Sequence, residues 1–166
     1  MIAEIRSVLS LWMSEVISSE DVVTWADRMI LAIDEPLEAL LDLSRGPGEY
    51  MRIPASEVPK PERLSFLDEF AIRASALNPS VSSELERFID WASQACLGED
   101  LNACEVHFSY GLFFLYIEGD DVEGAKIHVR NALPELLETC RDRAAPFWKA
   151  YAQQAVAADR PKAGSG

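Results

Sequence analysis

The chain has 166 residues, of which 28 are Asp or Glu and 15 are Lys or Arg, so its formal net charge is −13. This charge disfavours nucleic acid and anionic membranes as partners, because both are negatively charged and are bound through clustered basic residues. It suits a basic protein partner, whose approach an acidic surface accelerates. Apolar residues make up 49% of the chain, which is enough to build the core of one globular domain.

The first part of the chain predicts three amphipathic helices. Apolar residues recur at spacings of three and four from Ile2 to Val16 and again from Val22 to Ile33, the pattern of helices that bury one face. Pro36 is expected to open a short third helix, where its missing N–H does no harm, and Gly46 to end it.

A loop with repeated Gly and Pro follows, over residues 45–60. Long loops in compact domains are uncommon and are often functional or mobile. We favour the alternative that this loop is a strap held against the core by Tyr50, Met51 and Ile53.

The second half of the chain again predicts helices. Pro61 is expected to begin one. Another is expected to end in Gly-Leu-Phe-Phe-Leu-Tyr-Ile, residues 111–117, which is apolar on every side, so this helix is predicted to be central. Gly119 should end that helix and Asp120 should cap the next one. Pro134 is expected to divide the remaining stretch into two helices.

These patterns together predict an all-α fold, a single compact bundle of about seven to eight helices over residues 1–158, with a flexible tail at 159–166. The longest uncharged apolar run has about half the length of roughly 20 residues that a membrane span needs. Three cysteines without metal-site spacing indicate reduced thiols, so we expect a cytoplasmic protein.

Residues 112–133 resemble a tetratricopeptide hairpin, with Leu112 and Tyr116 before a turn at Gly119 and Asp120. Phe113 departs from the repeat, which has a small residue there, and the turn is one residue too long. No second copy follows at the period of the repeat, although a solenoid needs several copies. The resemblance implies a helical-repeat adaptor that binds peptides, but ordinary antiparallel packing of two helices explains the pattern better.

Catalytic motifs are scarce in this sequence. Its two histidines, His107 and His128, are expected at levels roughly 6 Å apart on neighbouring helices, by the rise of about 1.5 Å per residue, so a shared metal is not predicted. Cys104 lies three residues before His107 but is more simply a core cysteine. We therefore expect no enzyme, no catalytic residue, no metal and no cofactor.

One enzyme class stays open as an alternative. Asp34, Glu35 and Glu38 form one group of carboxylates, and Glu135 with Glu138 forms another. These groups resemble the paired carboxylates with which helical nucleotide pyrophosphatases hold magnesium on adjacent helices. Pro36 interrupts the first group, and two separated pairs supply few of the converging oxygens that magnesium needs.

The surplus acid is concentrated in two blocks, residues 18–42 and 84–123, with formal charges of −6 and −9. Within the first block, carboxylates recur at every fourth position, so we expect an unpaired acidic row on one side of the third helix. Exposed aromatic side chains beside such carboxylates would serve as anchors for a partner. The predicted partner-binding residues are Asp34, Glu35, Glu38, Asp42, Glu118, Asp121, Tyr50 and Trp91.

The segments Trp25 to Arg28, Asp34 to Pro36 and Leu41 to Ser44 are similar to an arrangement in small acidic all-α bacterial proteins. Such proteins resemble in character the immunity proteins that neutralise toxins of bacterial competition. The resemblance implies inhibition by occlusion, in which an acidic surface docks on the basic active site of a secreted toxin. It implies no individual residue roles, because immunity proteins share no common functional motif.

Overall fold

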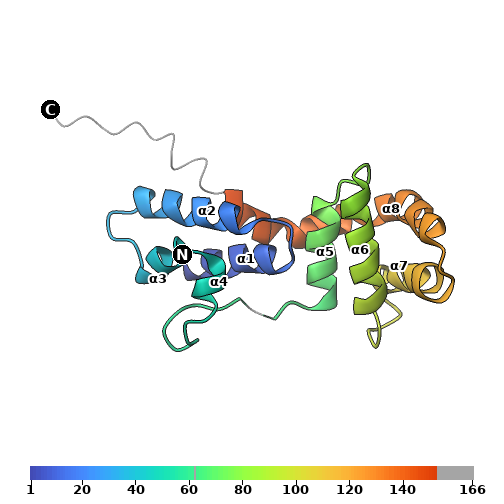
Figure 1. The fold of residues 1–166 in the computed structure, drawn as a ribbon, viewed down its shortest axis with the longest axis horizontal. Helices are drawn as coiled ribbons and strands as arrows, with labels where there is room; N and C mark the ends of the chain where they lie inside the picture. Colours follow the sequence, from blue (N-terminus) through green and yellow to red (C-terminus); the bar gives the residue numbers. More distant parts are fainter. Residues whose placement is uncertain (62, 153–166) are drawn as a thin grey trace. The chain divides into compact units, whose positions relative to one another are not determined.

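The computed structural model describes residues 1–61 and 63–152, and these form eight α-helices and one π-helical segment without any strand (Figure 1). The all-α class and the predicted seven to eight helices are therefore confirmed. None of the helices in the described ranges combines the length and the apolar character that a membrane span requires.

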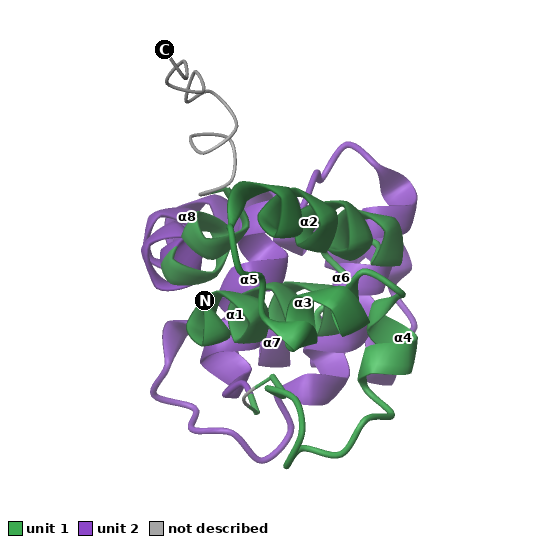
Figure 2. Cartoon of the chain, turned by 90° about the vertical axis from the view of Figure 1, so that its left-hand side faces the viewer, with its two compact units in different colours: residues 1–63, 146–166 green, residues 64–145 purple. Residues whose placement is uncertain are grey.

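The chain divides into two compact units, shown in different colours in Figure 2. Unit 1 comprises residues 1–63 and 146–166, and unit 2 comprises residues 64–145. The single domain expected over residues 1–158 stays a prediction beside this division. The expected tail at 159–166 lies outside the described residues.

Unit 1 is built from α1 (Ile2–Met13), α2 (Ser19–Ala32), α3 (Glu38–Leu43), α4 (Pro47–Tyr50) and the end of α8. A capping box begins α2: the Ser18 Oγ accepts a hydrogen bond from the Asp21 N–H at 3.1 Å, and the Asp21 carboxylate accepts one from the Ser18 N–H at 2.8 Å. The apolar stripes predicted for α1 and α2 meet in one core, which contains Ile5, Val8, Leu9, Val22, Trp25, Ala26, Leu40 and Leu43.

The loop after α3 is a strap, as predicted. Tyr50 and Val58 are buried in the unit 1 core, and Met51 and Ile53 pack against that core. The four-residue helix α4, which was not predicted, interrupts the loop at Pro47–Tyr50. Proline at the first position favours such a helix, because its N–H would have no helical partner.

Unit 2 contains α5 (Phe66–Ala76), α6 (Ser82–Ala95), α7 (Cys104–Leu112), the π-helix η1 (Phe113–Glu118) and most of α8 (Val122–Ala152). The prediction that Pro61 begins a helix was wrong: α5 begins only after Ser65, whose Oγ accepts a hydrogen bond from the Asp68 N–H at 3.2 Å. The core of this unit is rich in aromatic rings in mutual contact, contributed by Phe66, Phe70, Phe88, Trp91 and Phe108.

The hairpin predicted around Gly119 and Asp120 is present, with α7 and η1 before the turn and α8 after it. Asp120 has a φ of 50°, the left-handed conformation that Asp tolerates better than most residues. The predicted division at Pro134 was wrong, because α8 is continuous from Val122 to Ala152. A buried face on both sides of Pro134, including Val129, Leu133 and Cys140, holds the helix together across it.

Replacing Pro134 by Ala should stabilise the protein by about 2 kcal/mol. Proline in a helix interior is about 3 kcal/mol less favourable than Ala, and the greater freedom of the unfolded chain offsets about 1 kcal/mol of the gain. The exposed Pro134 ring contributes little packing that would be lost. Urea unfolding measures the change. Glu138→Ala, on the exposed surface of the same helix, is the control and should change the free energy of unfolding by less than about 0.5 kcal/mol. An unchanged or lower stability of Pro134→Ala would contradict the expectation.

Candidate functional site

The acidic row predicted for α3 does not form. Asp34 and Glu35 lie in the connection between α2 and α3, and Glu38 is the first residue of α3; all three are exposed. Asp42 is only part-exposed, and its Oδ1 accepts a hydrogen bond from the Arg45 guanidinium at 3.1 Å. The prediction was wrong on two counts, because Asp34 precedes the helix and because Arg45, three residues after Asp42, supplies a cationic partner.

Tyr50 is fully buried, so the expectation that it is an exposed anchor was wrong. Its hydroxyl donates a hydrogen bond to the carbonyl oxygen of Pro59 at 2.8 Å. The Lys60 ammonium donates to the carbonyl oxygen of Tyr50 at 2.8 Å and lies 5.2 Å from the centre of its ring. Burial, with a smaller contribution from the charge of Asp42, raises the pKa of Tyr50 to about 12. Tyr50 therefore fastens the strap to the core.

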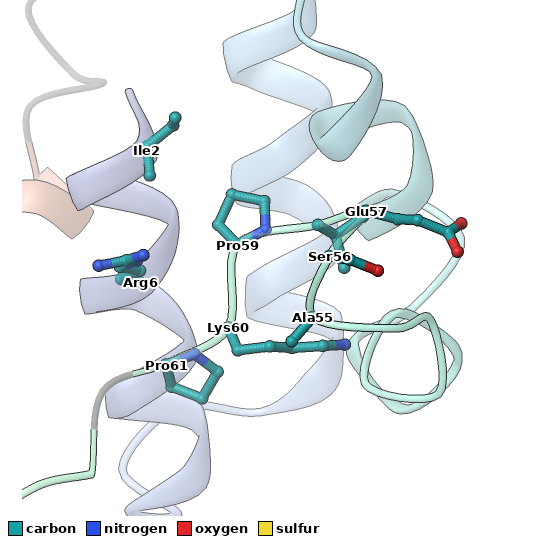
Figure 3. A pocket seen from close by; sticks show the side chains of 9 residues that line it. Ile2, Arg6, Ala55, Ser56, Glu57, Pro59, Lys60 and Pro61 are labelled. Atoms are coloured by element: carbon teal, nitrogen blue, oxygen red, sulfur yellow. The ribbon is translucent and has the colours of Figure 1, made fainter.

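A surface pocket of about 490 Å³ lies between the strap and α1 (Figure 3). Its lining includes the charged residues Arg6, Glu57 and Lys60. Figure 3 shows the Lys60 and Glu57 head groups pointing away from α1, and the Lys60 ammonium is already engaged by Tyr50. The pocket therefore has no converging set of polar groups of the kind that orients a small ligand.

Trp91 on α6 is part-buried and contacts both an aromatic ring and a guanidinium. Its ring stacks on Phe66 at a centroid separation of 5.7 Å, and the Arg73 guanidinium lies 4.7 Å from the ring centre. Arg73 is itself paired with Glu69 at 2.9 Å. Trp91 is thus a part-buried member of the aromatic cluster of unit 2.

Glu118 is the last residue of η1 and Asp121 directly precedes α8; both are exposed at this turn. The Asp121 carboxylate accepts a hydrogen bond from the Gly124 N–H at 2.8 Å, so Asp121 caps α8 in place of the predicted Asp120. Gly124 permits this contact, because a Cβ at that position would overlap the Asp121 carboxylate. Glu118 and Asp120 complete a group of three exposed acids within four residues.

The last part of the apolar run, η1, is not central, contrary to the prediction, although Phe108 and Leu112 before it are buried. No residue of η1 is buried, and Phe114 is 63% exposed. The residues of η1 are apolar on nearly every side, as expected from the sequence, but η1 lies at the surface. Phe114 was therefore missed as a candidate, although its exposed position beside an acidic turn makes it the most accessible aromatic ring of the candidate site.

The acidic surplus belongs mainly to unit 2, which has 15 Asp and Glu against six Lys and Arg, a formal charge of −9. Several of these cations are already engaged within the unit. Lys126 lies 2.8 Å from Glu86 and 3.2 Å from Glu123, and Arg143 lies 3.4 Å from Asp68. The hydrogen bond from Lys126 is the main reason why the pKa of Glu86 lies below its usual range.

The histidines and cysteines do not form a common site. His107 is exposed, whereas the His128 ring stacks on Phe108 at 4.9 Å. Cys96 and Cys140 are buried and Cys104 is exposed, all as free thiols; burial, helped by the charge of Glu105, raises the pKa of Cys140 to about 11. Across residues 1–61 and 63–152, no three His, Cys, Asp or Glu side chains are grouped to hold a metal ion.

The eight predicted partner-binding residues are divided between the two units. Asp34, Glu35, Glu38, Asp42 and Tyr50 belong to unit 1, whereas Trp91, Glu118 and Asp121 belong to unit 2. The two carboxylate groups that resemble a magnesium site are divided in the same way, because Glu135 and Glu138 lie on the unit 2 part of α8. Comparison with protein-family models, with curated proteins and with solved structures finds no match to this chain.

Proposed function

We propose that this chain is a protein-binding inhibitor that neutralises a basic protein, as an immunity protein neutralises a bacterial toxin. The observation that carries the proposal is the acidic excess of unit 2, a charge of −9 over residues 64–145. An excess of this size is more than helix capping requires, and it accelerates the approach of a cationic partner. Its cost is self-repulsion in the folded state, which a basic partner relieves.

The proposed mechanism is occlusion, without chemistry on the partner. Carboxylates at the η1 to α8 turn, which are exposed and follow one another closely, orient the basic partner during encounter. Apolar contact then holds the complex, since rim charges mainly affect the association rate and buried anchors mainly affect dissociation. Binding over the active site of the partner excludes its substrate.

The test uses the product of the gene beside the one that encodes this chain. Co-expression in a bacterial host should relieve the toxicity of that product, and the purified proteins should associate with a rate constant that falls about tenfold between 50 and 300 mM NaCl. A matched pair of variants compares two exposed acidic sites: Asp34→Asn with Glu35→Gln and Glu38→Gln in unit 1, and Glu118→Gln with Asp120→Asn and Asp121→Asn in unit 2. Association that is absent, or insensitive to both salt and these charges, would overturn the proposal.

A further inference from the structure

The π-helix η1 places an apolar sequence where water reaches it. Residues 111–117 read Gly-Leu-Phe-Phe-Leu-Tyr-Ile, and a helix of this composition is normally buried. Yet Phe114 is 63% exposed and Ile117 is 44% exposed. Conflicts between a local sequence and its environment are expected at functional sites, and π-helical turns are rare and often occur there.

Phe114 is held by neighbouring rings. Its centroid lies 5.6 Å from that of Phe113, in an edge-on arrangement, and 6.5 Å from that of Tyr110. An aromatic side chain fixed in this way loses little conformational freedom when a partner covers it, which is a property of anchor residues.

The loop between α6 and α7 extends this apolar surface. The Tyr110 hydroxyl lies 3.5 Å from the backbone N of Gly98, which places the loop beside the ring cluster. Leu97 and Leu101, in the same loop, are 53% and 58% exposed. We call Leu97, Leu101, Tyr110, Phe113 and Phe114 the platform.

Carboxylates follow the platform on both of its segments. Glu99 and Asp100 lie between the two leucines of the loop. Glu118 ends η1, and Asp120 and Asp121 follow it; all five carboxylates are exposed. Lys126, the first cation after the turn, is 12% exposed and is already paired with Glu86 and Glu123. The platform is therefore apolar with an acidic rim.

The five carboxylates around the platform, which we call the rim, limit the kinds of partner that could bind this apolar surface. A second copy docked through the same surface would bring its own five carboxylates against these five, and nucleic acid and anionic lipid would be repelled as well. A segment that carries both apolar and basic side chains satisfies the platform and the rim together.

We propose that the platform is the docking site for a cationic amphipathic segment of a partner protein, with Phe114 as its anchor. The inference deepens the proposed function and rests on it for the basic character of the partner. It assigns the contact to unit 2, and it gives the acidic residues of the α2 to α3 connection no direct role.

The experiment measures binding of the full chain to three fluorescein-labelled 18-residue helical peptides by anisotropy. One has a Leu face and a Lys face, one has Gln in place of Leu, and one has Glu in place of Lys. The Leu/Lys peptide should bind at least about tenfold more tightly than either of the others, because it alone matches both features.

Two variants of the chain separate anchor from rim. Phe114→Ser should weaken binding of the Leu/Lys peptide about tenfold at both 50 and 300 mM NaCl. The rim variant, Glu118→Gln with Asp120→Asn and Asp121→Asn, should weaken it about tenfold at 50 mM and much less at 300 mM; Asn at position 121 retains the cap on α8. Leu31→Ser is the matched control, because Leu31 is 87% exposed on α2 in unit 1, and it should change nothing.

Equal weakening by Leu31→Ser and Phe114→Ser would overturn the docking site, as would equal binding of the Leu/Glu peptide. If the free chain self-associated and Phe114→Ser abolished this, the platform would bind a second copy of the chain and not a basic partner. If Phe114→Ser left toxin neutralisation unchanged, the platform would not be the docking site, but the proposed function would stand. If the peptide bound through Phe114 and the chain neutralised no toxin, the docking site would stand and the proposed function would be wrong.

Discussion

Replacing Gly111 by Val should destabilise the protein by about 3 kcal/mol, because overpacking of a close helix contact adds to the poor helix propensity of a β-branched residue. A Cβ at Gly111 would lie 2.8 Å from Nε2 of His128. That ring has little room to move, since it stacks on Phe108 at 4.9 Å and its Nε2 lies 3.2 Å from the Phe108 carbonyl oxygen. Urea unfolding measures the loss.

A series at two glycines separates this contact from backbone effects. Gly111→Ala should lose about 1 kcal/mol, because the clash exceeds the gain of up to about 1 kcal/mol in helix propensity. Gly48, on α4, has no atom within 4 Å of the position of a Cβ, so Gly48→Ala should be neutral or slightly stabilising. Equal changes in unfolding free energy for Gly111→Ala and Gly48→Ala would show that α7 and α8 are far enough apart at Gly111 to admit a Cβ.

The parts of the fold that could be predicted are those set by local periodicity and capping. The stripe of α2, with Val22, Trp25 and Ala26 buried, and the cap at Ser18 both follow from residues within one or two turns. Such signals act at short range, so one sequence is enough to read them.

The failures have in common that tertiary packing overrides a local rule. Pro134 should end a helix, but buried residues on either side keep α8 continuous. Tyr50 was predicted both as part of the strap and as an exposed anchor, because nothing local shows that the Pro59 carbonyl oxygen accepts a hydrogen bond from its hydroxyl.

The candidate site was predicted only in part. Glu118 and Asp121 were identified from their charge, and both are exposed at the η1 to α8 turn. Phe114 was assigned to the core, because an apolar helix is normally a buried one. No periodicity distinguishes a buried apolar segment from an exposed one, so this residue needed the three-dimensional structure.

Replacing Tyr50 by Ala should destabilise the protein by about 3–5 kcal/mol, the usual loss for a fully buried aromatic side chain. Tyr50→Phe keeps the ring and removes only the hydrogen bond to Pro59, so it should lose about 1 kcal/mol at neutral pH. Urea unfolding of the two variants would measure both losses. Because Tyr50 is in the core, Tyr50→Phe should leave partner binding unchanged, and weaker binding by this folded variant would contradict a purely structural role.

The Tyr50 hydroxyl also makes a prediction for alkaline pH. Burial raises the pKa of Tyr50 from its ordinary value near 10 to about 12 in the folded protein, so the unfolded chain ionises first. The contribution of the neutral Tyr50 hydroxyl to the free energy of unfolding is complete below pH 10. It is lost as the pH rises towards 12, by up to about 2.5 kcal/mol at 1.36 kcal/mol per pH unit. Tyr50→Phe lacks this loss, whereas the loss from Cys140, whose pKa is raised to about 11, is common to both proteins and cancels. The difference in unfolding free energy between the two should therefore shrink and then change sign between pH 9 and pH 12, and a constant difference would mean that the hydroxyl ionises as freely in the folded protein as in the unfolded chain.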